Sequence, residues 1–410
     1  MQAKDEVFAY LDGAVDGMVE LESLLAAIPA IAPESGGEGE ARKAEALVAW
    51  LRGRGIAEIE RVDSPDPRVP GGLRPNVVAT IPGGRPGLGR LWIMSHLDVV
   101  PEGDRSMWGS DPFKVVRKDG KVYGRGVEDN QQGLVSSVFA ALAFLERGIR
   151  PARTIKLLFV ADEEVGSVHG IQRVLEAADL FRKEDLIVVP DGGSPDGSEI
   201  EVAEKNICWL KVVTKGRQCH ASTPDEGANA FLAACELALR GHALEETAFP
   251  ARDGLFEPDR TTIQPTKKEP NVPNINTIPG DDVFYFDMRI LPRYSVDEVL
   301  VALSKVAREV EAARGVAISF EVVQRNESRA TPKDAPVVAA LSRAIGEVYG
   351  VKARAIGIGG GSVAAYLRNA GFDCAVWARM EETAHQPNES ARMADLVGDA
   401  KVFASMALEG

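Results

Sequence analysis

The 410-residue chain has few cysteines, no excess of basic residues and no long apolar run, and each shortage excludes a class of protein. Its four cysteines show no CxxC spacing, which argues against a cysteine zinc site or a disulfide framework and predicts free buried thiols. With Lys+Arg 47 against Asp+Glu 61, a net charge of −14 offers no binding surface to nucleic acid or to an anionic membrane. No stretch approaches the roughly twenty apolar residues of a membrane span.

The N-terminal segment also lacks the features of a secretory signal. Residues 1–28 contain no cationic start followed by an apolar run and a small-residue cleavage site. A composition with 45% hydrophobic and 26% charged residues is typical of a soluble globular protein, and the length suits two domains. We therefore predict a cytoplasmic protein whose ligand is a small molecule.

Helix and strand patterns alternate along the first half of the chain. Helical patterns cover 5–28 and 39–52, strand patterns cover 57–61, 76–81 and 91–95, and the alternation continues to about Asp191. Strands interleaved with helices predict an α/β fold with a mixed, mostly parallel sheet and helices on both faces. Residues 200–216 then form a longer run that alternates polar and apolar positions, as a half-exposed strand does.

A different pattern interrupts this α/β chain. A helix at 227–244, a strand at 282–291, a helix at 296–313 and a strand at 316–323 are typical of helices laid on an antiparallel sheet. The α/β pattern resumes at about 335. We therefore predict a main domain in two parts, 1–207 and 325–410, with an inserted α+β domain at 208–324.

Five side chains that commonly bind metal ions stand in short polar segments after or between apolar runs. They are His96, Asp129, Glu164, Asp191 and His385. In open α/β sheets the ligand site lies outside the carboxyl ends of the strands, so the segments that follow strands are predicted to meet there. A carboxylate two residues after His96, that of Asp98, can hold the imidazole in its metal-binding tautomer.

This set of ligands predicts a pair of metal ions. One bridging carboxylate with a histidine and a carboxylate on either side suffices for two divalent ions, and mixed nitrogen and oxygen ligands suit zinc, with cobalt or manganese as substitutes. Of the adjacent residues Glu163 and Glu164, one can bind metal while the other serves as general base. Taken alone, Glu163-Glu164 or Asp191-Gly192 would more often be a solvated turn. Their conjunction favours a site.

At these residues the chain resembles the M20 metallopeptidases and deacylases. That family includes acetylornithine deacetylase, succinyl-diaminopimelate desuccinylase, carboxypeptidase G2-like enzymes and carnosinase-like dipeptidases. The resemblance covers nearly the whole chain and rests on motifs in a specific order: Ser95-His-Leu-Asp-Val-Val-Pro101, Tyr123-Gly-Arg-Gly-Val-Glu-Asp129, Asp162-Glu-Glu-Val-Gly166, Pro190-Asp-Gly192 and Glu382-Thr-Ala-His385.

The resemblance implies a role for each metal ligand. His96 and Asp191 would bind one ion, Glu164 and His385 the other, and Asp129 would bridge the two. The main domain would then be catalytic, with the zinc-exopeptidase type of α/β fold.

The resemblance also implies the proton chemistry. Glu163 would be the general base, with Asp98 as the partner of the His96 ring. The shared water would lose a proton to Glu163, which would pass it to the leaving nitrogen. The peptide bond between Asp129 and Asn130 is expected to be cis.

Other matching residues lie in the inserted domain. His220 corresponds to the histidine that, in dimeric relatives, reaches into the partner's site, which implies a homodimer formed through the inserted dimerisation or lid domain. Asn276 and Arg289 resemble contacts to a substrate carboxylate, a task that suits the bidentate fork of arginine. A salt bridge from Arg289 to Asp287 is the alternative.

A glycine run closes the set of substrate-binding candidates. Gly360, Gly361 and Ser362 offer backbone N–H groups at a predicted helix start, which suit an anionic carboxylate. A plain tight turn is the alternative.

The implied activity is hydrolysis of an amide bond in a small carboxylate-bearing substrate, with an N-acyl amino acid deacylase as the leading hypothesis. The alternatives are a dipeptidase or carboxypeptidase of the same family and a hydrolase of a non-peptide C–N bond. A binding protein would require a missing ligand or base, and none is missing. Three departures leave the substrate open: Asn130-Gln-Gln-Gly133 replaces the usual Met-Lys-Gly, Val363 follows Ser362 where Asp is frequent, and Asp191 stands where desuccinylases typically have Glu.

Overall fold

The computed structural model describes residues 2–177 and 179–409, and the chain divides into two units. Unit 1 comprises Met1–Val202, Thr331–Ala355 and Tyr366–Gly410, and unit 2 comprises Ala203–Ala330 and Ile356–Ala365. The glycine run, which the sequence-based division places in the main domain, therefore packs with unit 2. One contact that holds it there is a β-bridge between Phe256 and Gly357.

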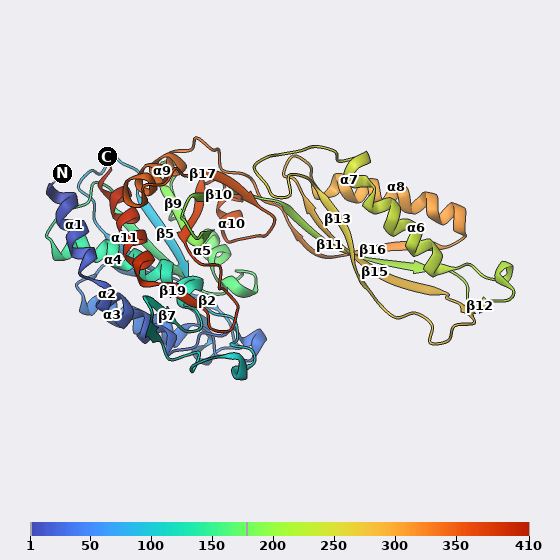
Figure 1. Cartoon of the computed structure of the whole chain (residues 1–410), viewed down its shortest axis with the longest axis horizontal. Coiled ribbons are helices and arrows are strands. Elements are labelled where there is room, and N and C mark those ends of the chain that lie inside the picture. Colours follow the sequence, from blue (N-terminus) through green and yellow to red (C-terminus); the bar gives the residue numbers. More distant parts are fainter. Residues whose placement is uncertain (1, 178, 410) are drawn as a thin grey trace. The chain divides into compact units, whose positions relative to one another are not determined.

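An eight-stranded sheet in the order β1-β4-β8-β5-β9-β18-β10-β17 forms the centre of unit 1 (Figure 1). Its strands are β1 (Ile59–Arg61), β4 (Val77–Ile81), β5 (Leu91–His96), β8 (Ile155–Val160), β9 (Leu186–Ser194), β10 (Glu199–Glu204), β17 (Arg354–Ile358) and β18 (Cys374–Arg379). Strands β8, β5, β9 and β18 run parallel to their neighbours within this group, whereas β1, β4 and β10 pair antiparallel. The predicted α/β class with a mostly parallel central sheet is confirmed.

The central strands are apolar along nearly their whole length. Every residue of β4 and of β5 is buried, because both faces of the sheet are covered by other elements. Five short strands of unit 1 lie outside this sheet. Strands β2 (Ser64–Pro65) and β3 (Leu73–Arg74) form a pair, and β6 (Val116–Lys118), β7 (Lys121–Tyr123) and β19 (Ser390–Arg392) form a three-stranded sheet. Since the four parallel strands share one direction, their carboxyl ends lie at one edge of the sheet.

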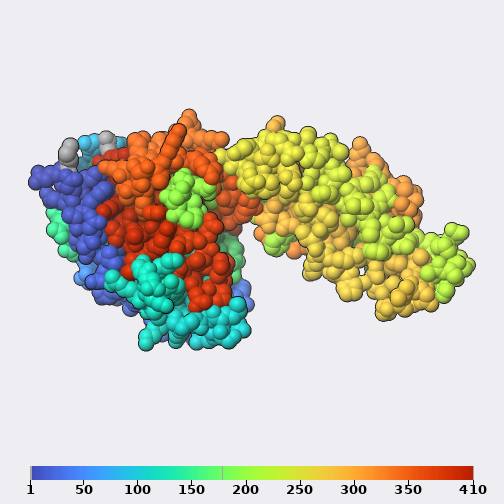
Figure 2. All heavy atoms as spheres, viewed as in Figure 1, coloured from blue at the N-terminus to red at the C-terminus, as the bar shows by residue number. Residues whose placement is uncertain are grey.

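The helices of unit 1 are α1 (Gln2–Asp12), α2 (Val15–Ala26), α3 (Ala41–Gly53), α4 (Gly133–Glu146), α5 (Ile171–Ala177), α9 (Pro336–Tyr349), α10 (Ala364–Asn369, which begins in unit 2) and α11 (Met393–Leu408). The single helix predicted at 5–28 is wrong, because α1 ends in a tight turn. The N–H groups of Gly13 and Ala14 donate to carbonyls three residues back. Helix α4 is apolar all round and packs on β5, β8 and β9. Helix α1 contacts α11, and Figure 2 shows N-terminal residues in blue next to C-terminal residues in red on this unit.

Unit 2 is an antiparallel sheet in the order β13-β15-β11-β16, with α6 and α8 packed on one face (Figure 1). Its elements are β11 (Asn206–Lys215), β12 (Cys219–His220), α6 (Ala230–His242), α7 (Leu244–Thr247), β13 (Thr262–Lys268), β14 (Thr277–Ile278), β15 (Asp281–Ile290), α8 (Val296–Arg314) and β16 (Ala317–Asn326). The single strand predicted at 200–216 is wrong. It divides at Lys205, whose buried Nζ donates to the carbonyls of Pro258 and Arg260, both at 2.7 Å.

Two predictions drawn from shortages in the sequence can be compared with the structure. All four cysteines are free, as predicted, although Cys219 and Cys235 are only partly buried. Among residues 2–177 and 179–409, no helix combines the length and apolar character needed to cross a membrane.

Asp399, on the buried face of α11, gives a prediction about stability and pH. It accepts hydrogen bonds from the Tyr349 hydroxyl at 2.7 Å and the Gln132 side chain at 3.0 Å, and burial raises its pKa to about 7. Between about pH 4 and 7 the folded protein holds a proton that the unfolded chain releases, so stability falls as pH rises through this window. Asp399→Asn mimics the protonated acid. We expect the free energy of unfolding of the variant, measured relative to wild type by denaturant unfolding, to rise by about 2–4 kcal/mol from pH 4 to pH 8. A constant difference would contradict the assignment.

Candidate metal centre

The predicted ligands come from four parallel strands and from one turn before α4. His96 is the last residue of β5, and Asp191 lies in the second half of β9. Glu164 belongs to the short helix η5 (Glu163–Val165) that follows β8, and His385 lies in the loop that follows β18. Asp129 lies in the irregular turn η4 (Val127–Gln132). The structure brings all five together at the carboxyl edge of the sheet.

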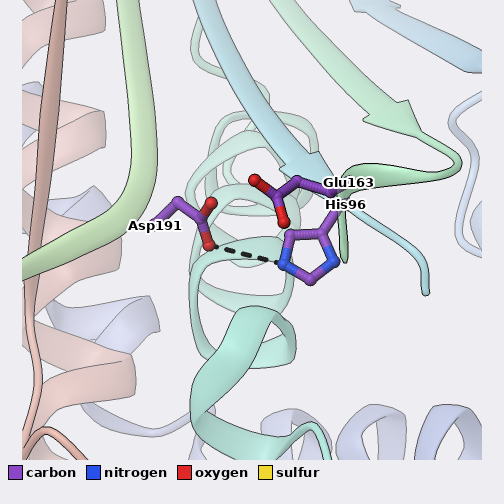
Figure 3. A group of neighbouring side chains, drawn as sticks. All are labelled: His96, Glu163 and Asp191. Carbon is purple, nitrogen blue, oxygen red and sulfur yellow. Dashed lines mark ion pairs between the residues drawn. The ribbon is translucent and has the colours of Figure 1, made fainter. Parts of the chain in front are cut away.

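His96 forms one side of the cluster. Its Nε2 lies 2.8 Å from Asp129 Oδ1 and 3.4 Å from Asp191 Oδ1, and Figure 3 shows the imidazole facing Asp191 and Glu163. Its Nδ1 lies 3.0 Å from the Asp98 carbonyl oxygen and 3.5 Å from Asp98 Oδ1. These acceptors favour a proton on Nδ1, which leaves Nε2 directed at the other carboxylates.

His385 forms the other side. Its Nε2 lies 3.1 Å from Asp129 Oδ2 and 3.1 Å from Glu164 Oε2. The two oxygens of Asp129 thus face different histidines, one His96 and the other His385. This is the position that a bridging carboxylate requires.

Two further side chains hold the ligands, and sequence analysis had not assigned these contacts. The carboxylate of Asp98 accepts the backbone N–H groups of Glu163 at 3.1 Å and Glu164 at 3.0 Å. The Asn130 amide donates to Asp191 Oδ1 at 2.7 Å, and the Asp129–Asn130 peptide is cis, as the resemblance implied. The only signal in the sequence was a polar residue adjacent to a ligand.

The histidines show how negative this site is. Burial lowers the pKa of His96, but the carboxylates of Asp191 and Asp129 outweigh burial and hold that pKa well above its usual range. Hydrogen bonds to Asp129 and Glu164 raise the pKa of His385 to about 10. Both imidazoles are therefore stabilised as cations, in a place where positive charge is favoured.

The carboxylates show the same excess of charge. Burial raises the pKa of Asp191 to about 6, against the opposing effect of His96. Burial and the neighbouring Asp191 raise the pKa of Glu163 well above its usual range. Several acids thus crowd together in a buried site, and cations would relieve their repulsion.

The donor atoms fit divalent metal ions. Two groups of ligand atoms each lie within 4.8 Å of one another: His96, Glu163 and Asp191, and His96, Asp129 and Glu164. Imidazole nitrogen with carboxylate oxygen is the donor set of zinc-type sites. Because Glu163 belongs to one of these groups, the distances alone do not separate the base from the ligands.

Two sequence-predicted residues meet at the two-stranded antiparallel β12–β14 sheet of unit 2. His220 pairs with Thr277, and its Nε2 lies 3.5 Å from the side-chain nitrogen of Asn276. The Ser222 hydroxyl lies 2.7 Å from His220 Nδ1. Both residues are exposed, so that their polar groups are accessible to a ligand.

Arg289 lies on β15 beside the glycine run. Its guanidinium donates to both oxygens of Asp287, at 2.7 and 3.0 Å, and to the Gly359 carbonyl at 2.8 Å. The salt bridge considered as an alternative is therefore present. It fixes the guanidinium against the glycine run.

The glycine run packs closely against other parts of unit 2. The Ser362 hydroxyl donates to Glu204 Oε1 at 2.8 Å, so its proton is committed to an acid of the protein. A Cβ atom on Gly361 would lie 3.2 Å from the Asn326 side chain, which leaves little room for a larger residue. The predicted carboxylate contacts are the backbone N–H groups of Gly360, Gly361 and Ser362, which these side-chain contacts do not test.

Comparisons with known proteins agree on one family. The model described as peptidase family M20/M25/M40 matches residues 92–409. An uncharacterized metallohydrolase of Methanocaldococcus jannaschii is 39% identical over 404 residues, 95% of this chain and 98% of the relative. Succinyl-diaminopimelate desuccinylase of Methylobacterium radiotolerans is 29% identical, over 93% and 94% of the two chains. The solved structure of aminopeptidase PepT from Bacillus cereus has a TM-score of 0.78 at 21% identity, over 96% and 98% of the two chains.

Proposed function

Because the chain belongs to peptidase family M20/M25/M40 and is a metal-dependent hydrolase of amide bonds, we propose that its substrate is a small amide with one free carboxylate. N-acyl amino acids are the leading class. The observation that carries this proposal is Arg289, fixed by Asp287 beside the backbone N–H groups of the glycine run. A fixed guanidinium with nearby N–H donors suits a single carboxylate.

The charges around Arg289 argue against a second carboxylate on the substrate. Asp287 already neutralises the guanidinium, and the buried Glu204 lies under Ser362. A succinyl group would bring an additional negative charge close to these acids, at a cost in repulsion. The desuccinylase relative therefore serves as a guide to the reaction more than to the acyl group.

In the proposed mechanism His96 and Asp191 would hold one ion, Glu164 and His385 would hold the other, and Asp129 would contribute to both positions. Family membership supports two divalent ions, and we propose zinc, which the nitrogen and oxygen donors suit. When bound, the ions would polarise the amide carbonyl and acidify a water molecule.

The proton transfers fall to Glu163. Its carboxylate takes a proton from the attacking water and then delivers it to the leaving nitrogen. Asp98 fixes the backbone of Glu163 and the ring of His96 at the same time.

His220 is proposed to stabilise the oxyanion that develops on the substrate, and Asn276 to contact the substrate carboxylate. Their side chains lie together on the two-stranded β12–β14 sheet. We propose that the protein is a homodimer in which this small sheet serves the partner's site.

The dimer proposal is supported by the surface of unit 2. Helix α6 exposes Phe231, Leu232 and Leu239, the last at 72%, beside the edge strand β13. An unpaired edge next to exposed apolar side chains favours pairing with a second copy. Sedimentation equilibrium would show a dimer, and a monomer at micromolar concentration would reject the proposal.

The four free thiols suit a reducing compartment, so a cytoplasmic location stays our prediction.

The substrate proposal is tested by a panel of amides with the zinc-loaded enzyme. The panel pairs each N-acetyl amino acid with its C-terminal amide, and adds N-succinyl-diaminopimelate and dipeptides, with a chelated control. We expect hydrolysis of the free acids and little of the amides. Turnover of dipeptides alone would assign the alternative peptidase activity. If no compound of the panel is hydrolysed although two ions are bound, the result would favour a substrate with a non-peptide C–N bond.

Arg289 offers a direct test of carboxylate binding. We expect Arg289→Lys to raise KM for the preferred acid about 10- to 100-fold with a smaller change in kcat, because a charged hydrogen bond to the substrate is lost and an ammonium group cannot keep the planar two-point contact with Asp287. Arg314→Lys, on the surface of α8, is the matched control. An unchanged KM would mean that Arg289 only supports the sheet.

A further inference from the structure

Two segments that carry metal ligands are joined by a pair of buried glutamates that the mechanism does not use. Glu389 is fully buried, four residues after His385. Its Oε1 accepts the backbone N–H groups of Glu128 at 2.9 Å and Asp129 at 3.0 Å. Its Oε2 accepts the N–H of Gly126 at 3.0 Å. The His385 segment thus binds the backbone that carries Asp129.

The reverse contact is also present. Glu128, next to Asp129, is 1% exposed, and its Oε1 accepts the backbone N–H of Glu381 at 2.5 Å. Its Oε2 accepts the Thr383 hydroxyl at 2.7 Å and the Thr383 backbone N–H. The Asp129 segment thus binds the backbone that leads to His385. We call Glu128 and Glu389 together the carboxylate clamp.

The His385 segment needs such external support. Glu382, His385 and Asn388 have positive φ angles of 64°, 63° and 61°. This left-handed conformation is disfavoured for most residues other than glycine and asparagine, so Glu382 and His385 do not adopt it on their own account. The loop has neither a regular helix nor a strand between β18 and β19 to hold it. Contacts with another segment must therefore fix the position of the His385 side chain.

The chemistry of the clamp requires carboxylates. Within residues 2–177 and 179–409, the hydrogen bonds to the Glu389 carboxylate all come from donors: three backbone N–H groups and the Arg125 guanidinium at 2.6 Å. An ionised carboxylate only accepts, whereas a glutamine amide would direct its own N–H groups at some of these donors. The same holds for Glu128, which faces two backbone N–H groups and a hydroxyl.

We propose that Glu128 and Glu389 are positioning residues that fix Asp129 relative to His385. They thereby set the affinity for metal at the position formed by Glu164 and His385. This inference rests on the ligand assignment in the proposed function. Neither glutamate is a predicted ligand, and each acts on the backbone of a ligand-bearing segment.

The clamp makes a selective prediction because its two members act on different segments. Glu128→Gln releases the loop before His385 and should weaken the position formed by Glu164 and His385 about 10- to 100-fold, as expected for supports of metal ligands. Glu389→Gln disturbs the backbone of Asp129, which both positions share. It should therefore weaken both.

The experiment measures zinc in the holoenzyme after equilibration with graded chelator, together with the thermal midpoint of each protein. Asp185→Asn is the matched control, because Asp185 is a buried carboxylate that precedes β9, at the opposite end from Asp191, and accepts from Arg90 and Trp92. We expect wild type and Asp185→Asn to keep two ions over the same chelator range. Glu128→Gln should lose one ion earlier, and added zinc should restore kcat with KM unchanged.

Each outcome decides a separate question. If wild type does not hold two ions, the ligand assignment of the proposed function fails. If wild type holds two and Glu128→Gln releases them over the same range, the clamp proposal alone is overturned. Equal weakening of both ions in Glu128→Gln and in Asp185→Asn, in step with their thermal midpoints, would reduce the clamp to a general effect on folding. If Glu389→Gln does not fold, the selective loss in Glu128→Gln still decides.

Discussion

Replacing Glu163 by glutamine should lower kcat about 10²- to 10⁴-fold and leave both metal ions bound. The amide has the shape of the acid but cannot take up a proton, so the change removes the transfer and preserves the packing. Activity assays on metal-loaded protein measure kcat, and the zinc content of the same sample gives the number of bound ions.

The neighbouring residue provides the matched control for this experiment. Glu164→Gln removes a proposed ligand that lies 3.1 Å from His385 and should release one ion. Loss of an ion from Glu163→Gln instead would show that the two glutamates have exchanged roles. The distances allow that exchange to be tested, because Glu163 also lies among the grouped ligand atoms.

Replacing Asp129 by asparagine should have the broadest effect on the site. One Asp129 oxygen faces His96 at 2.8 Å and the other faces His385 at 3.1 Å, so the change removes a charge that both metal positions share. We expect both ions to be bound more weakly and kcat/KM to fall about 10³-fold, which corresponds to several kcal/mol of lost electrostatic stabilisation. Titration with Co²⁺, followed by its visible absorption, separates the two binding steps.

Asp191→Asn is the comparison for the bridging role. Asp191 lies 3.4 Å from His96 and takes no part in a contact with His385 among the residues that the structure describes. Its loss should weaken one position only. If Asp129→Asn and Asp191→Asn weaken the same single position, Asp129 is not a bridge.

The metal-ligand segments were predictable because local sequence encodes burial. An apolar run such as 91–95 or 155–160 must lie inside a sheet, and the polar residue that ends it must emerge at the edge. His96 and Glu164 could therefore be placed at one edge of the sheet from the sequence. The order of the motifs then identified the family, which the comparisons confirm.

The tertiary structure decided the features that depend on contacts between distant segments. No periodicity reveals that Glu389 binds the backbone of Glu128 and Asp129, that Glu128 binds the backbone of Glu381 and Thr383, or that Ser362 gives its proton to Glu204. A buried carboxylate and an exposed one look the same in a sequence. The hydrogen-bond donors that compensate a buried carboxylate for its lost hydration come from elsewhere in the chain.

The division of the chain shows the same limit. The run at 200–216 alternates as a strand should, yet Lys205 separates it into strands of two different sheets. The glycine run follows the α/β pattern in sequence but packs with the inserted unit through Phe256. The sequence by itself therefore determined most element types and the family, and it predicted the ligand residues, because these follow from local pattern and residue chemistry. Only the tertiary structure decided which side chains hold those ligands in place, because hydrogen bonds between distant segments exist only after folding has brought them together.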